Sequence, residues 1–206
     1  MTSGQKSITW QEVKRIVSSM ELYHLVRTRA MSEVYRKYRE DIKAKGLNFG
    51  EILLLKLNWT QDELNYLNDD KYPADNDKID AAFSNADLYT LRLNDFPYNF
   101  ESDVHHILIW SKVKLPLYEE DFTESAADKT KIQLPSMNKH MQQKIETFLQ
   151  INVAGKFGIP KENYVWFVNY SKLQSVRSIS HIHLLLKKDD DLITAKIFEE
   201  NFDPLV

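Results

Sequence analysis

Four of the six histidines of this sequence fall in two short apolar stretches, so imidazole is the group most able to do chemistry here. The stretches are VHHILIWSK, residues 104–112, and HIHLLLK, residues 181–187. Both are rich in β-branched and other apolar residues, as β-strands are. Imidazole titrates near neutral pH, so it can act as a nucleophile, transfer a proton, bind an anion or ligate a metal ion.

The spacing of these histidines determines which of them can meet. Side chains alternate between the faces of a strand, so His181 and His183 share one face while the leucines and isoleucine around them point into the core. If the two strands are neighbours, we predict that His106 joins them in one polar pocket, with Asn169 and Ser175 at its edge. A structural role at the rim of a sheet is the alternative. A zinc site needs further ligands that no spacing supplies, so we predict no metal and no cofactor.

Composition limits the classes of protein that could carry this pocket. The 206 residues suit one domain, 1–206, and 43 % hydrophobic residues supply a core. The absence of cysteine excludes disulfides and thiolate chemistry. A net charge of −3 gives no general attraction to nucleic acid, and no apolar run approaches the ~20 residues that span a bilayer. We expect a cytoplasmic protein, or also a nuclear one, with neither nucleic acid nor membrane as a partner.

The first part of the chain, residues 1–67, predicts a helical block. Apolar residues recur there at helical spacing, and FGEILLLKL at 49–57 is apolar nearly all round, as a buried helix is. The basic stretch 27–45 could hold phosphate or RNA, but a solvated helix face is the interpretation we favour. Tyr35 and Tyr38 lie on the apolar stripe of that helix, so we assign them to the core.

The second part of the chain, residues 88–206, predicts strands and helices in turn. We expect an amphipathic helix from Pro135 and a final helix after residue 191, with polar surface loops at 68–78 and 119–131. The predicted strands are 88–93, 104–112, 164–170 and 181–187. Helices first and mixed elements afterwards indicate an α+β fold, with the helical block packed on an antiparallel sheet.

Three stretches together resemble the fungal N-acetylglucosamine-induced protein family. They are the helix opened by Trp10 with Arg27 and Tyr35 beyond it, NDFPYNFESDVHHILIWSK at 94–112, and VWFVNYSKLQSVRSISHIHLLL at 165–186. The resemblance covers nearly the whole chain. It places His106, Trp110, Asn169, Ser175, His181 and His183 on family positions, and it implies a response to an amino sugar rather than a known reaction.

A more distant likeness is to the histidine-triad fold, in which a strand, a helix, a strand ending in Asn, a Gln-Ser-Val segment and an H-φ-H-φ-H strand follow one another. The likeness implies that His183 attacks the α-phosphate of a nucleotide with His181 in support. It also implies that His106, Asn169, Gln174 and Ser175 bind the ligand. Two features depart from the pattern. Leu185 stands at the third histidine position and cannot donate a hydrogen bond, and residues 177–180 lengthen the segment before the motif.

Three functions remain open from the sequence. Because of Leu185, we favour a binding or regulatory protein for a nucleotide or a phosphorylated sugar. The first alternative is a histidine-dependent nucleotide hydrolase or transferase. The second is a helical scaffold that binds a protein partner through residues 8–67.

Overall fold

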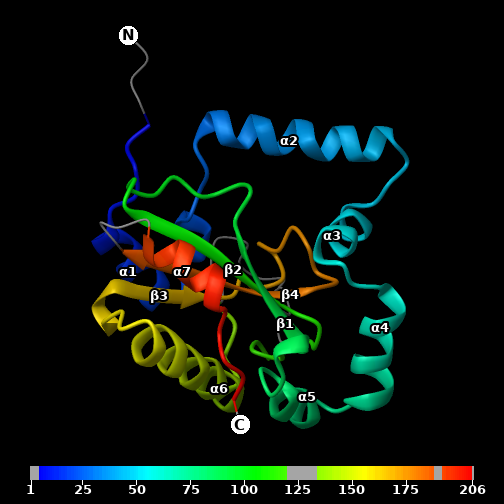
Figure 1. Cartoon of the computed structure of the whole chain (residues 1–206). Helices are drawn as coiled ribbons and strands as arrows, with labels where there is room; N and C mark the ends of the chain where they lie inside the picture. The colour runs from blue at the N-terminus through cyan, green and yellow to red at the C-terminus, as the bar shows by residue number, and fades with distance from the viewer. Residues whose placement is uncertain (1–4, 120–133, 188–191, 206) are drawn as a thin grey trace, which may run out of the picture.

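The structure, a computed structural model, describes residues 5–119, 134–187 and 192–205. At its centre is an antiparallel sheet with the strand order β1-β2-β4-β3, and helices lie on both sides of it (Figure 1). The strands are β1 (Tyr89–Leu93), β2 (Val104–Ser111), β3 (Tyr164–Phe167) and β4 (Ser180–Lys187). The predicted α+β class and all four predicted strands are confirmed.

The third strand is shorter than predicted, since it ends at Phe167 and not at Tyr170. Beyond Phe167 the backbone carbonyls bond to side chains instead of a neighbouring strand. Tyr118 donates to the carbonyl of Val168, and Gln174 donates to that of Asn169. This departure from the sheet turns Asn169 toward the histidines.

Seven α-helices surround the sheet in the part of the chain that is described. They are α1 (Trp10–Ser18), α2 (Arg29–Ala44), α3 (Phe49–Leu57), α4 (Gln61–Asn65), α5 (Asp75–Ala81), α6 (Lys139–Leu149) and α7 (Leu192–Glu200). Helices α4 and α6 continue as π-helical turns, Tyr66–Lys71 and Gln150–Lys156. Short 3₁₀ turns occupy Leu22–His24, Ala86–Leu88 and Lys161–Asn163. None of the helices in these ranges combines the length and the apolar composition that a membrane-spanning segment requires.

Helix α6 begins later than the sequence suggests, at Lys139 rather than near Pro135. The side chain of Asn138 accepts hydrogen bonds from the backbone N–H groups of His140 and Met141, which caps the helix. Met137 forms an isolated bridge with Tyr118 and is therefore outside the helix.

The predicted surface loop at 68–78 is wrong, because this segment is largely helical. The buried side chain of Asn68 donates to the carbonyl of Lys112 and accepts from the N–H of Lys114, so it ties the segment to the end of β2. The loop was predicted from the acidic composition of the segment, which does not indicate these hydrogen bonds. The other predicted loop, 119–131, lies outside the described residues from 120 onward.

One face of the sheet carries the main core. Alternate side chains of β2 and β4 are completely buried against α6, with α5 and α7 beside it. The strand residues are Ile107, Ile109, Ile182, Leu184 and Leu186. The face that the sequence assigned to the core is therefore the buried apolar face, which leaves His106, His181 and His183 on the other side.

The second face of the sheet is covered by two separate apolar clusters. Trp10 and Val13 of α1 pack against Leu185 at one end, and α3 and α4 pack against Leu108 and Trp110 at the other. Helix α3 is not buried all round as predicted, since Leu55 is 76 % exposed. Helix α2 extends along the same side of the molecule and buries Ile42 alone (Figure 1).

Candidate functional site

Three imidazoles meet on the second face of the sheet. In the register of β2 and β4, His181 lies opposite Trp110 and His183 lies opposite Leu108. His106 is the diagonal neighbour of His183, and its Nε2 is 2.8 Å from Nδ1 of His183. The ring centroids of His181 and His183 are 5.1 Å apart. The structure thus brings together the three histidines that alternation predicted.

Aromatic rings hold His183 in a fixed orientation. Phe167, its partner in β3, stacks on the imidazole at 4.6 Å with an interplanar angle of 3°. Tyr98 stacks less closely, at 5.9 Å. His183 is only 4 % exposed, so its hydrogen bonds decide how its protons are placed.

Both ring nitrogens of His183 have partners. Nδ2 of Asn169 is 3.3 Å from Nε2 of His183 and 3.1 Å from the hydroxyl of Tyr98. An amide N–H donates, so Nε2 of His183 accepts and the proton of the neutral ring lies on Nδ1. That Nδ1–H then donates to Nε2 of His106. The side chain of Asn94 approaches the His106 ring at 3.3 Å.

Burial keeps the three imidazoles uncharged. It lowers the pKa of His106 to about 3, with the charge of Arg27 and the nearby His181 as smaller causes. Burial also holds the pKa of His183 well below its usual range, and the nearby His106, His181 and Arg27 lower it further. Burial lowers the pKa of His181 as well, although the hydrogen bond to the carbonyl of Ile179 raises it in part. Near neutral pH this cluster offers neutral donors and acceptors rather than positive charge.

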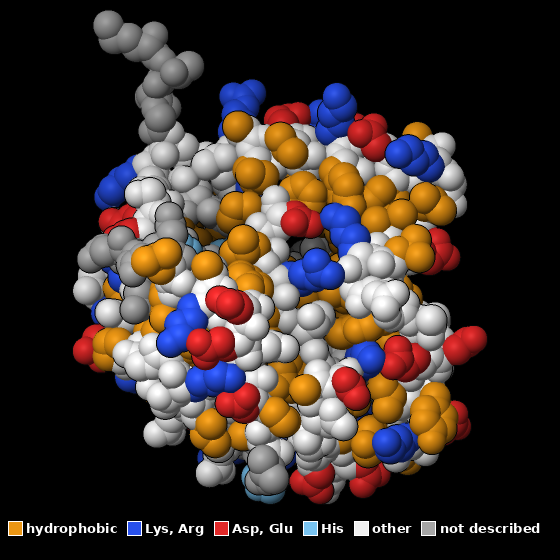
Figure 2. All heavy atoms as spheres, in the orientation of Figure 1, with side chains coloured by type: hydrophobic (Ala, Val, Ile, Leu, Met, Phe, Trp, Pro, Cys, Tyr) orange, Lys and Arg blue, Asp and Glu red, His pale blue; other side chains and the backbone are white. Residues whose placement is uncertain are grey.

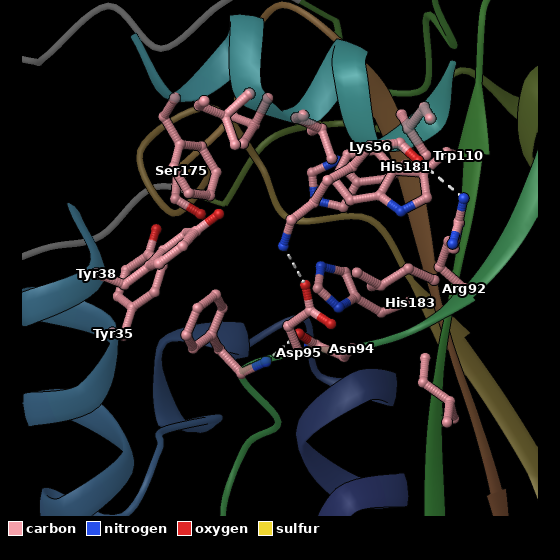
Figure 3. Close-up of a pocket in the computed structure, with 18 of the residues that line it drawn as sticks. Tyr35, Tyr38, Lys56, Arg92, Asn94, Asp95, Trp110, Ser175, His181 and His183 are labelled. Carbon is pink, nitrogen blue, oxygen red and sulfur yellow. Dashed lines mark hydrogen bonds and ion pairs between the residues drawn. The ribbon is translucent and has the colours of Figure 1, made fainter. Parts of the chain in front are cut away.

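A cavity of about 330 Å³ opens beside the cluster. Figure 3 shows His181 and His183 on one side of it, with Tyr35 and Tyr38 of α2 opposite. In the space-filling view a hollow lies below α2, with basic side chains next to it (Figure 2). The rest of its wall comes from α3, from the segment after β1, and from Ser175 and Asn169. His106 is hydrogen-bonded to His183 but does not line the cavity, so the prediction that His106 lies in the same pocket is wrong.

The cavity wall is largely aromatic and apolar, and most of its charged side chains are basic. It contains three cationic side chains, Arg27, Lys56 and Arg92, and one carboxylate, Asp95. Lys56 and Asp95 form an ion pair at 3.0 Å, drawn in Figure 3. Arg92 donates to the carbonyl of Lys56 at 2.8 Å, which fixes it near the end of α3.

Arg27 is the cation of this wall that the aromatic rings enclose most closely. Its guanidinium carbon lies 4.5 Å from the centre of the Tyr35 ring and 5.2 Å from that of Tyr98. Nε donates to the carbonyl of Phe96 at 2.8 Å. Within the described ranges, Arg27 forms no ion pair with a carboxylate. Its positive charge is therefore available to an anion in the cavity.

The remaining predicted site residues take different positions. Gln174 does not line the cavity and instead braces the backbone of Asn169 at 2.6 Å. His105 points to the other face, where its Nδ1 is 3.0 Å from the hydroxyl of Thr194 in α7. In the described parts of the chain, no group of three or more His, Cys, Asp or Glu side chains could hold a metal ion.

Sequence reasoning missed much of the cavity wall. Tyr35 and Tyr38 are not core residues, because both line the cavity. Arg27 does not lie on a solvated helix face, since it is packed between aromatic rings before α2 begins. The signal that could have found them was the occurrence of Tyr35 and Tyr38 within a basic stretch. Their proximity to the histidines depends on tertiary structure.

Comparisons with known proteins agree with the family resemblance. The family described as "Protein of unknown function (DUF3605)" matches residues 9–187. N-acetylglucosamine-induced protein 1 of Candida albicans is 35 % identical over 189 residues, 89 % of this chain and 69 % of that protein. An uncharacterized protein of Saccharomyces cerevisiae is 34 % identical over 177 residues, 86 % of this chain and 77 % of the other.

A solved structure shares the fold. The crystal structure of HTC1 has a TM-score of 0.71 to this chain at 30 % identity, covering 96 % of this chain and 99 % of that one. The predicted resemblance to the N-acetylglucosamine-induced protein family is thus confirmed. The likeness to the histidine-triad fold stays a prediction.

Proposed function

The chain belongs to the DUF3605 family of proteins of unknown function, and on that premise we propose that it binds a small phosphorylated metabolite, a nucleotide or a phosphorylated sugar, in the cavity beside His181 and His183. The name of the Candida albicans relative ties that protein to N-acetylglucosamine. We propose that the present chain also takes part in a response to N-acetylglucosamine. A cytoplasmic or nuclear location and a protein partner stay predictions.

The observation that carries this proposal is the position of Arg27. A guanidinium held between aromatic rings keeps its planar donor groups in a fixed orientation, and such a fork matches the geometry of phosphate and carboxylate groups. Arg27 bonds a backbone carbonyl through Nε, which leaves its terminal nitrogens for an anion. The three neutral imidazoles nearby would not compete with it as cations.

The cavity also suits the remainder of such a ligand. A volume of about 330 Å³ is at the lower end of the range of small-molecule pockets. Tyr35 and Tyr38 line the cavity, so their rings offer aromatic surface to the rest of the ligand.

The geometry favours binding over the catalytic alternative. In the histidine-dependent hydrolase or transferase, His183 would attack phosphorus and His181 would support it. Nε2 of His183 already accepts a hydrogen bond from Asn169, and Nδ1 is bonded to His106. Attack by His183 would therefore require Asn169 to release Nε2 first.

A thermal-shift screen tests the proposal. The panel contains inorganic phosphate, nucleoside monophosphates, nucleotide sugars and phosphorylated amino sugars. A ligand at about 100 times its Kd stabilises the folded protein by about 2.7 kcal/mol, which raises Tm by several degrees. Arg27→Met keeps the packing of the side-chain stem and removes the charge, so it should abolish the shift.

Arg36→Met is the matched control for this screen. Arg36 lies on the exposed side of α2 and pairs with Glu33 and Glu40 away from the cavity. This control should retain the full shift. No shift with any phosphorylated compound, or an equal shift in Arg27→Met, would overturn the proposed function.

A further inference from the structure

His181 is held rigidly at the cavity wall. It lies directly opposite Trp110 in the pairing of β4 with β2, and the two ring centroids are 4.4 Å apart. The centroid of the His183 ring is 5.1 Å away. These contacts leave the imidazole little freedom to rotate, so the chemistry of its two nitrogens is fixed by its surroundings.

One nitrogen of His181 is a donor. Nδ1 lies 3.1 Å from the backbone carbonyl of Ile179, and a carbonyl can only accept a hydrogen bond. Nδ1 therefore carries a proton. Burial lowers the pKa of His181, and no carboxylate is hydrogen-bonded to its ring among the described residues, so the ring is neutral near pH 7 and carries one proton. The lone pair of the neutral imidazole is then on Nε2.

The lone pair on Nε2 faces the cavity. Nε2 of His181 makes no hydrogen bond to the described part of the chain. Among the described residues, two side-chain polar atoms are both fully buried and without a partner, the hydroxyl of Tyr35 and one oxygen of Asp103. Nε2 of His181 is not one of them, although it has no partner. Nε2 is therefore accessible, and the open space beside His181 is the cavity. Figure 3 shows the imidazole in this wall.

We propose that His181 selects the ligand by accepting, at Nε2, a hydrogen bond from a hydroxyl group of a phosphate ester whose phosphate binds Arg27. This rests on the proposed function and narrows it. A phosphate oxygen and a neutral Nε2 are both acceptors, so they repel each other, and the phosphate must lie away from His181. His183 cannot replace it in this role, because both of its nitrogens are occupied.

This assignment differs from the one the histidine-triad likeness implies. There the second histidine of the motif, His183, contacts the ligand and His181 supports it. The hydrogen bonds here assign ligand contact to the first histidine and leave His183 to position Asn169 and His106. A ligand without a hydroxyl at the correct position leaves Nε2 unpaired on binding, which is how the site discriminates.

Calorimetric titration with matched ligand pairs tests this selection. The pairs are a hexose phosphate and a nucleoside monophosphate, each beside the analogues that lack one hydroxyl. For the wild type, removing the hydroxyl that reaches Nε2 should weaken binding by about three- to tenfold. In His181→Phe, which keeps the ring contact with Trp110, the pair should bind equally. His140→Phe, an exposed position on α6, is the control and should discriminate like the wild type.

The outcomes separate the two proposals. If no phosphate ester binds the wild type, the proposed function fails and this inference fails with it. If phosphate esters bind through Arg27 but no hydroxyl affects affinity, or if His181→Phe still discriminates, the role of His181 alone is overturned.

A measurement on the wild type covers the case in which His181→Phe does not fold. Imidazole ¹⁵N chemical shifts distinguish a protonated from an unprotonated ring nitrogen. His181 should show a proton on Nδ1 and none on Nε2, and the Nε2 signal should move when a hydroxyl-bearing ligand is added. A proton on Nε2 in the free protein would refute the proposal.

Discussion

Acid should destabilise this protein through its buried imidazoles, well before most of its carboxylates are protonated. An unfolded histidine has a pKa of about 6.5, so it takes up a proton as the pH falls from about 7 to about 5. In the folded protein the pKa of His106 is lowered to about 3, mainly by burial, so His106 stays uncharged over that range. The unfolded state binds the additional proton, and the free energy of unfolding falls as the pH falls.

The magnitude follows from the two pKa values of His106. Its contribution to stability is complete above a pH of about 6.5 and decreases until the pH reaches about 3. Between about pH 7 and pH 5 the loss from His106 is about 2 kcal/mol, because one proton corresponds to about 1.4 kcal/mol for each unit of pH. His181 and His183 have pKa values lowered by burial too, and they add to the loss.

Urea unfolding at about pH 7, 6 and 5 measures this effect. The variant His106→Gln cannot titrate, so it should lose about 2 kcal/mol less than the wild type over the same range. His140→Gln, at an exposed position, is the control and should behave like the wild type. Equal losses in the wild type and in His106→Gln would refute the conclusion that His106 is buried and uncharged.

Three further predictions concern stability. Trp110 is 6 % exposed, so Trp110→Ala should cost about 3–5 kcal/mol in urea unfolding, and a loss no larger than that of Trp166→Ala, at a half-buried position, would contradict it. Asn68→Ala should cost about 1–3 kcal/mol, because the carbonyl of Lys112 and a neighbouring N–H lose their partner; unchanged stability would show that water replaces them. Gly158 has φ +64° with nothing within 4 Å of an added Cβ, so Gly158→Ala should lower stability by about 1 kcal/mol from backbone strain alone, and a rise in Tm would contradict this.

The sheet could be predicted from the sequence because its strands carry their pattern locally. The alternation of His181 and His183 with Ile182 and Leu184 indicated both the strand and its buried face, and the structure confirms the side on which His181 and His183 lie. The sequence did not establish that the strand with His106 pairs with the strand with His181 and His183. That pairing was an assumption about the topology.

The cavity could not be predicted in the same way, because its wall is assembled from distant segments. Tyr35 has the spacing of a core residue on a helix, and a helical stripe does not reveal whether it faces a packed core or an enclosed space. Asn68 shows the same limit for the predicted loop. The acidic composition of this segment indicates a solvated loop. Only the structure shows that the buried amide of Asn68 bonds to Lys112, which is 44 residues away in the sequence.

The pairing of β2 with β4 has a consequence for how the protein folds. His106 and His183 are 77 residues apart in sequence, and they become neighbours when these strands pair. Closing so long a loop has an entropic cost that precedes any gain from contacts, and sheets built on such pairings form slowly, in about milliseconds to seconds. Helices α1, α3 and α4 pack their apolar residues on this same sheet, so they gain these contacts only when the strands have paired. The helical side of the cavity and the imidazole cluster would therefore be completed together, and ligand binding would report the completion of the sheet.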